Sequence, residues 1–151
     1  MAECFGMADF YSSNLKKLGY EAEDAICNGE SLQRQWANEN GVKTQGDNWL
    51  FQVLLAQIKK YQPDVLYVFE GSPLSDDFLW EIKPFVRLMV GQIACSLPQD
   101  QKKFRNYDLI LSSLPNIVEQ FKKMGIPAEF LRLGFEETIL KRLKKVKGYA
   151  Q

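Results

Sequence analysis

Apolar residues recur at helical spacing in several segments of the chain. The clearest is "DNWLFQVLLAQIKKY", in which Leu50, Leu54 and Ile58 fall on one side of a helix. Other segments begin at a capping residue, such as Ser75 before two acids, or end at a glycine. The pattern predicts helices over residues 9–19, 30–41, 47–61, 75–85 and 113–125, the last capped by Ser113, and a final helix from Glu136.

Short apolar runs separate these helices. The strongest is Val65–Phe69, which is continuous, as expected for a strand that is covered on both faces. The pattern predicts strands over residues 20–28, 63–71, 86–94, 107–113 and 127–134. Because strands alternate with helices, we expect an α/β, three-layer Rossmann-like domain with a mainly parallel sheet of about five strands, the first short or missing.

Composition narrows the chemistry. Lys+Arg and Asp+Glu balance at 19 each, so the charge gives no general attraction to nucleic acid. The chain has no histidine, which removes the commonest general base and a favoured zinc ligand. Cys4, Cys27 and Cys95 form no C-x-x-C pair, which favours a reducing, cytoplasmic setting. No apolar run approaches the ~20 residues of a membrane span, and we expect no signal peptide.

Ligands of doubly wound sheets bind beyond the carboxyl ends of the strands. The stretches "FGMAD", "EGSPLS", "GQIACS", "SSLPN" and "LGFEE" follow predicted strands or precede predicted helices, although small residues there also serve turns and caps. Glu70 ends a buried strand, where an acid has either a functional role or a role in a cap or salt bridge. The predicted catalytic residues are Asp9 and Glu70, and the predicted substrate-binding residues are Gly6, Gly71, Gln92, Ser112, Ser113, Gly134, Phe135 and Glu136.

Two familiar phosphate-binding signatures do not occur. The sequence contains neither G-x-G-x-x-G nor G-x-x-x-x-G-K-[ST], so it has no dinucleotide fingerprint and no P-loop. We therefore expect no dinucleotide cofactor, and no other cofactor is predicted from the sequence.

The order and spacing of several motifs resemble a known family. These are "FGMADFYSSNLKKLGYEAEDAICNGESLQRQWANENG", "PDVLYVFEG", "VGQIACSLP", "YDLILSSLP" and "EFLRLGFEETIL", which together cover nearly the whole chain. They resemble the amino-terminal domain of GT-B glycosyltransferases, and most closely the spore-maturation-protein (CgeB-like) type.

The resemblance implies a function shared between two domains. In that family the amino-terminal Rossmann-like domain mainly binds the acceptor, and a second domain binds most of the nucleotide sugar. Residues 1–135 would be the first domain, and residues 136–151 would lead to a donor domain outside this chain. Gly134, Phe135 and Glu136 would lie at the junction. The full enzyme would transfer a sugar to an unknown acceptor without a metal ion, and this chain alone would be inactive.

The family's first strand is nearly missing here, since only "MAECF" precedes Gly6. Three arrangements could fill its place. Ala2–Phe5 could form a short strand, which we favour, Glu21–Asn28 could shift inward, or a second chain could supply an edge in a homodimer.

Two other functions compete with this interpretation. A receiver-like binding or dimerisation domain would need a phosphorylatable Asp where Glu70 stands. A complete small-molecule enzyme is disfavoured because the chain has no histidine and no nucleophile elbow.

Overall fold

The computed structural model describes residues 9–69, 74–97, 102–134, 136, 137 and 139. The chain divides into two compact units. One unit is Ile26–Arg132, and the other combines Met1–Ala25 with Leu133–Gln151.

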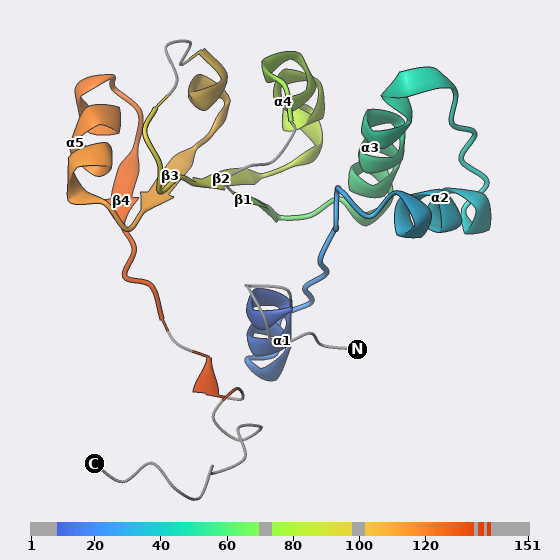
Figure 1. Ribbon diagram of the computed structural model, residues 1–151, viewed down its shortest axis with the longest axis horizontal. Helices are drawn as coiled ribbons and strands as arrows, with labels where there is room; N and C mark the ends of the chain where they lie inside the picture. Colours follow the sequence, from blue (N-terminus) through green and yellow to red (C-terminus); the bar gives the residue numbers. More distant parts are fainter. Residues whose placement is uncertain (1–8, 70–73, 98–101, 135, 138, 140–151) are drawn as a thin grey trace, which may run out of the picture. The chain divides into compact units, whose positions relative to one another are not determined.

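A four-stranded, all-parallel sheet forms the centre of the unit Ile26–Arg132 (Figure 1). Its strands lie in the order of the sequence: β1 (Val65–Phe69), β2 (Leu88–Gln92), β3 (Leu109–Ser112) and β4 (Ala128–Phe130). The protein is therefore α/β and Rossmann-like, as the alternating pattern predicts, although the described sheet has four strands instead of about five.

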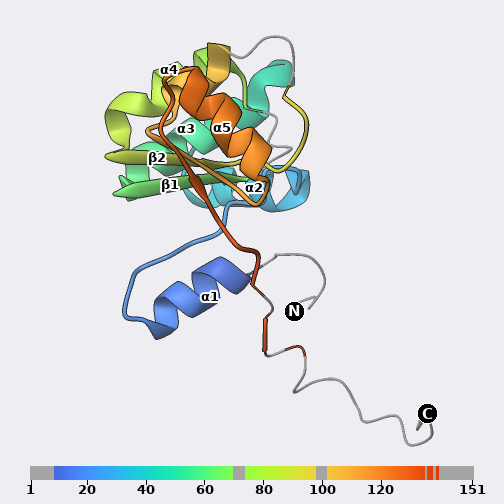
Figure 2. The same cartoon turned by 90° about the vertical axis from the view of Figure 1, so that its left-hand side faces the viewer.

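Helical segments connect the strands. Helix α4 (Asp76–Ile82) and the 3₁₀ turn Lys83–Phe85 follow β1, the 3₁₀ segment Lys102–Asn106 follows β2, and α5 (Pro115–Lys123) follows β3. Two helices precede the sheet, α2 (Glu30–Glu39) and α3 (Trp49–Tyr61), with the 3₁₀ turn Gly46–Asn48 between them, and Figure 2 shows the same elements from the side. Each predicted helix from 30–41 to 113–125 is thus present.

The register of the strands defines two faces of the sheet. Val68 lies opposite Gly91, Gly91 opposite Ile110, and Ile110 opposite Ala128, so their side-chain positions share one face, here called the inner face. Met89 and Ile110 on this face have no exposed surface, and they pack in one core with Leu79 of α4 and Phe121 of α5. Burial of these side chains against the helices is the main stabilisation of the unit.

The opposite face, here called the outer face, is less covered. It holds alternate residues of the strands, namely Val65, Tyr67, Phe69, Leu88, Val90, Gln92, Leu109, Leu111 and Glu129. Val65 is 53% exposed, Phe69 38% and Leu88 37%. The prediction that the strands are buried on both faces therefore holds for the inner face and only partly for the outer one.

The prediction of a strand over residues 20–28 is wrong. These residues form no strand, and the chain turns so that Gly29 N–H donates to the Ile26 carbonyl at 3.0 Å. Gln33 Nε2 donates to the same oxygen at 3.2 Å. The segment is rich in acids, and Glu23 forms an ion pair with Lys16 at 3.0 Å. The segment thus makes side-chain contacts instead of the backbone hydrogen bonds of a sheet.

The predicted cap of α5 also differs from the structure. The N-cap residue is Leu114, and Ser113 makes no capping hydrogen bond. Ser112 Oγ accepts from Leu114 N–H at 3.2 Å instead. By contrast, Ser75 caps α4 as predicted, because its side chain accepts from Phe78 N–H at 3.3 Å.

The second unit contains α1 (Phe10–Lys17), which confirms the first predicted helix. The short strand expected over Ala2–Phe5 lies outside the described residues, as does most of the helix expected from Glu136. The domain boundary at residue 135 stays a prediction.

Gly91 is expected to accept a side chain only at a cost in stability. A Cβ atom there would lie 2.9 Å from Ile110 Cδ1 and 3.1 Å from the Tyr107 ring. Gly91→Ala should lower the free energy of unfolding by about 1–3 kcal/mol, because the inner face cannot expand without strain. Urea denaturation measures this, with Gly134→Ala as control because nothing lies within 4 Å of its added Cβ. Equal stability of the two variants would contradict the close packing at Gly91.

Asp108 should make stability depend on acid pH. Partial burial acts to raise its pKa, but the hydrogen bond from Lys83 Nζ (2.5 Å), that from Met89 N–H (2.7 Å) and the Lys83 charge together lower it. The resulting stabilisation is present above the unfolded-state pKa of ~3.9 and is lost as the pH falls through the folded-state pKa.

Asp108→Asn should therefore reduce the free energy of unfolding at pH 7, by less than about 1 kcal/mol because the Lys83–Asp108 pair is partly exposed. The variant should also lose less stability than the unmodified protein when the pH falls from about 5 to about 3. Urea denaturation at each pH measures both effects, with Glu81→Gln at an exposed position as control. If the stability of Asp108→Asn depends on pH in the same way as that of the unmodified protein, Asp108 is not a source of the acid sensitivity.

Candidate binding site at the carboxyl edge of the sheet

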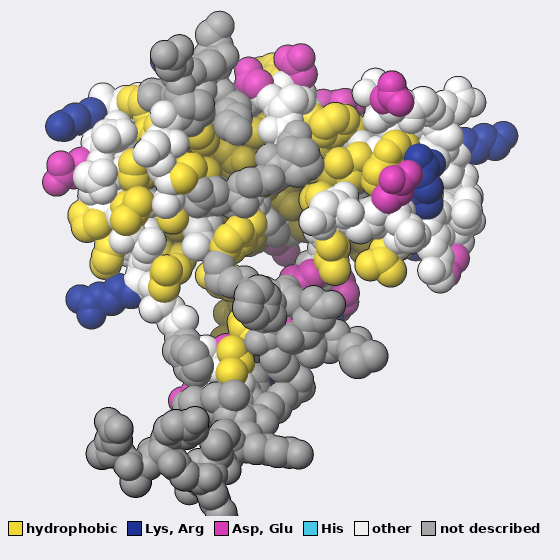
Figure 3. Space-filling view, in the orientation of Figure 1, with side chains coloured by type: hydrophobic (Ala, Val, Ile, Leu, Met, Phe, Trp, Pro, Cys, Tyr) yellow, Lys and Arg dark blue, Asp and Glu magenta, His cyan; other side chains and the backbone are white. Residues whose placement is uncertain are grey.

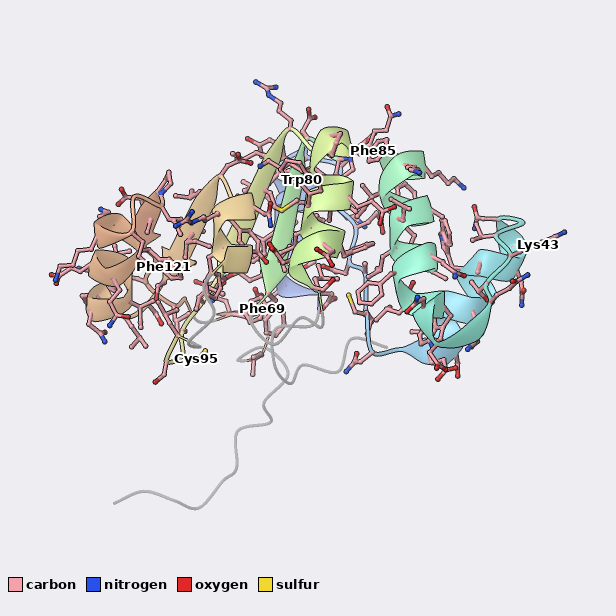
Figure 4. All side chains as sticks on the ribbon, turned by 90° about the horizontal axis from the view of Figure 1, so that it is seen from above. Lys43, Phe69, Trp80, Phe85, Cys95 and Phe121 are labelled. Carbon is pink, nitrogen blue, oxygen red and sulfur yellow. The ribbon has the colours of Figure 1, made fainter. Side chains whose placement is uncertain are left out.

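The carboxyl ends of β1, β2 and β3 bring several polar and aromatic residues to one edge of the sheet. Phe69, Gln92 and Ser112 are the last residues of these strands, and parallel pairing places all three at the same edge. Figure 4 shows Phe69 and Cys95 at this edge and Phe85 at the opposite one. Gln92 and Ser112, two of the predicted substrate-binding residues, therefore share one edge of the sheet.

A buried polar contact lies on the outer face near this edge. The Tyr67 hydroxyl donates a hydrogen bond to Gln92 Oε1, and Gln92 is only 3% exposed. The register allows the contact because Phe69 lies opposite Gln92, and Tyr67 is two residues earlier on the same face. A buried amide must be hydrogen-bonded to avoid a penalty of roughly 1–3 kcal/mol, so this pair holds both side chains in place.

Two aromatic rings stand beside Gln92. The centroids of the Tyr67 and Phe69 rings are 6.3 Å apart, and their planes are tilted by 49°. Sequence reasoning missed both residues, because Val65–Phe69 reads as a uniformly apolar strand. Only the pairing of β1 with β2 shows that this face meets Gln92.

Ser112 projects to the other face of the sheet. Leu111 lies opposite Gln92, so the next residue, Ser112, belongs to the inner face. It has no exposed surface, and its hydroxyl serves the start of α5 through Leu114 N–H. Ser113, which follows, is half-buried. Gln92 and Ser112 therefore share an edge, but their side chains lie on opposite faces.

Three further predicted residues belong to the second unit. Asp9 precedes α1, and its carbonyl accepts from Ser13 N–H at 2.8 Å. Asn14 Nδ2 donates to Glu136 Oε2 at 2.7 Å, which joins α1 to a segment 122 positions away in the sequence. Gly134 is exposed. Within this unit, Glu136 thus contacts the helix that Asp9 precedes.

Four predicted residues lie outside the described part of the chain, namely Gly6, Glu70, Gly71 and Phe135. Their roles stay predictions.

The side chains of β1, β2 and β3 on the outer face are neutral. A phenol, a phenyl ring and an amide occupy its carboxyl end, and every outer-face position of β1, β2 and β3 is uncharged. On the same face of β4, Glu129 pairs with Lys122 at 3.3 Å. Such an edge can stack a ring and form hydrogen bonds, but these side chains supply no acid or base at neutral pH.

Within the described ranges, no three or more carboxylate or thiol side chains gather where they could hold a metal ion. No helix in those ranges has the length and apolar character needed to cross a membrane. Figure 3 shows hydrophobic side chains over the centre of the sheet-bearing unit and Lys and Arg toward its margins.

Comparison with known proteins gives no relative for this chain: no protein family matches it, and no curated protein or solved structure is significantly similar to it.

Proposed function

We propose that this chain is the acceptor-binding half of a glycosyltransferase, which transfers a sugar from a nucleotide sugar to an acceptor hydroxyl. The observation that most supports the proposal is the Tyr67–Gln92 pair at the carboxyl edge of an all-parallel sheet. Ligands of such folds bind at that edge. The motif order from "FGMAD" to "LRLGFEETIL", which resembles GT-B enzymes, is the second support.

The chemistry of the edge fits a binding role better than a catalytic one. The Tyr67 phenol, held by the Gln92 amide, can orient a neutral ligand, whereas activation of an acceptor hydroxyl needs a base. The predicted acids are Asp9 and Glu70, of which Asp9 belongs to the second unit and Glu70 lies outside the described residues. In the proposed enzyme, the sheet edge holds the acceptor and a second domain brings the nucleotide sugar.

The isolated chain should bind nucleotide sugars poorly. A diphosphate is usually held by Arg, Lys or helix N-termini, and the outer-face positions of β1, β2 and β3 include no basic residue. We expect dissociation constants above about 1 mM for UDP-, GDP- and TDP-sugars by isothermal titration calorimetry. A micromolar constant for any of them would overturn the assignment of the chain to the acceptor side.

A further inference from the structure

Phe69 presents an aromatic surface at the carboxyl edge. It is the last residue of β1 and is 38% exposed. This exposure is unfavourable, because removal of a phenyl ring from water lowers the free energy. The Tyr67 ring stands next to it on the same face, at 6.3 Å between centroids. Together the two rings form a surface that is here called the aromatic platform.

Gln92 fixes one half of this platform. Its buried amide accepts from the Tyr67 hydroxyl, so rotation of the Tyr67 ring away from this position would leave a buried oxygen without that donor. The Tyr67 ring is therefore held in place before any ligand arrives. Such preorganisation reduces the entropy that a ligand must overcome on binding.

The ligand that fits the platform is neutral. The side chains at the outer-face positions of β1, β2 and β3 carry no charge, so none of these side chains compensates a phosphate, a carboxylate or an ammonium group. A pyranose ring has an apolar C–H face, which can stack on the electron-rich face of an aromatic ring. Its rim carries hydroxyls, which can form hydrogen bonds with polar groups of the protein. An acyl chain would use the ring surface but not the polar groups around it.

We propose that the aromatic platform seats a neutral pyranose of the acceptor, with Phe69 as the contact residue and Gln92 as a positioning residue that acts through Tyr67. This inference rests on the proposed function, because it assigns the acceptor to the saccharides.

Saturation-transfer NMR on the full chain tests the proposal. The probes are methyl β-D-glucopyranoside, methyl β-D-galactopyranoside and methyl β-D-N-acetylglucosaminide, with glucose 6-phosphate as a charged comparison. We expect at least one neutral pyranoside to bind with a millimolar dissociation constant and through its C–H face. Phe69→Ala and Phe69→Leu should each weaken it about tenfold, since each removes the ring and the second keeps apolar volume.

Phe85→Ala is the matched control. Phe85 has nearly the same exposure, 36%, and lies at the opposite edge of the sheet (Figure 4). Its replacement should leave pyranoside binding unchanged. If none of the three pyranosides binds at 50 mM, or if binding is equally sensitive to Phe69 and Phe85, the platform has no such role.

A double-mutant cycle tests the role of Gln92. Gln92→Met and Tyr67→Phe should each weaken binding by about threefold, and Gln92→Met should have no further effect in the Tyr67→Phe background. Additive losses would show that Gln92 does not act through Tyr67. Thermal unfolding of every variant checks that the folded fraction is the same.

The experiments distinguish failure of the proposed saccharide site from failure of the proposed glycosyltransferase function. Micromolar binding of a nucleotide sugar that is unaffected by Phe69→Ala would overturn the proposed function, while pyranoside binding lost in Phe69→Ala would still locate a saccharide site. Weak nucleotide-sugar binding together with no pyranoside binding would leave the proposed function and remove the aromatic platform.

Discussion

The packing of the inner face of the parallel sheet against α4 and α5 determines most of the structure of the unit Ile26–Arg132. Met89 and Ile110 lie at the centre of this packing without any exposed surface. Gly91 follows Met89 by two residues on β2 and lies opposite Ile110, and the Tyr107 ring and Ile110 fill the space that a side chain would need. Because this face fixes the register of β1, β2 and β3, it also decides which residues reach the carboxyl edge and on which face they project.

The candidate site follows from that register. Gln92 is directed to the outer face, where Tyr67 satisfies its amide, and Ser112 is directed inward, where it serves the start of α5. A one-residue shift of β2 would turn Gln92 to the inner face, where its amide would enter the apolar core. The polar contact at the edge therefore depends on apolar packing on the other side of the sheet, and it gives the register a second, weaker constraint.

Local patterns predicted the elements well where one physical cause dominates. The helix around Leu54 and the strand Val65–Phe69 were predictable, because each has a clear period or a continuous apolar run. The segment at residues 20–28 was not, because small apolar residues there suggested a strand while Glu21, Glu23 and Asp24 favour solvent and side-chain partners. Ser113 looked like a cap, but the N-cap residue of α5 is Leu114, whose N–H donates to the hydroxyl of Ser112.

The candidate site at the carboxyl edge was predicted only in part, because its geometry depends on contacts between distant segments and not on local patterns. The rule for parallel sheets places Gln92 and Ser112 at one edge from sequence alone. Which face each side chain occupies depends on pairing between distant strands, and that information is not local. The same limit hid Tyr67 and Phe69, whose partners on β2 are more than 20 positions away.

Mapping of ligand contacts by ¹H–¹⁵N chemical shifts tests the central claim most directly. The claim is that the carboxyl edge of the sheet binds a neutral saccharide on its outer face. On titration with methyl β-D-glucopyranoside or methyl β-D-N-acetylglucosaminide, we predict the largest shifts at the amides of Phe69, Gln92 and Cys95, with little change at Asp64, Leu88 and Asp108 at the opposite edge. Shifts concentrated at the opposite edge, or on α2 and α3, would contradict the claim.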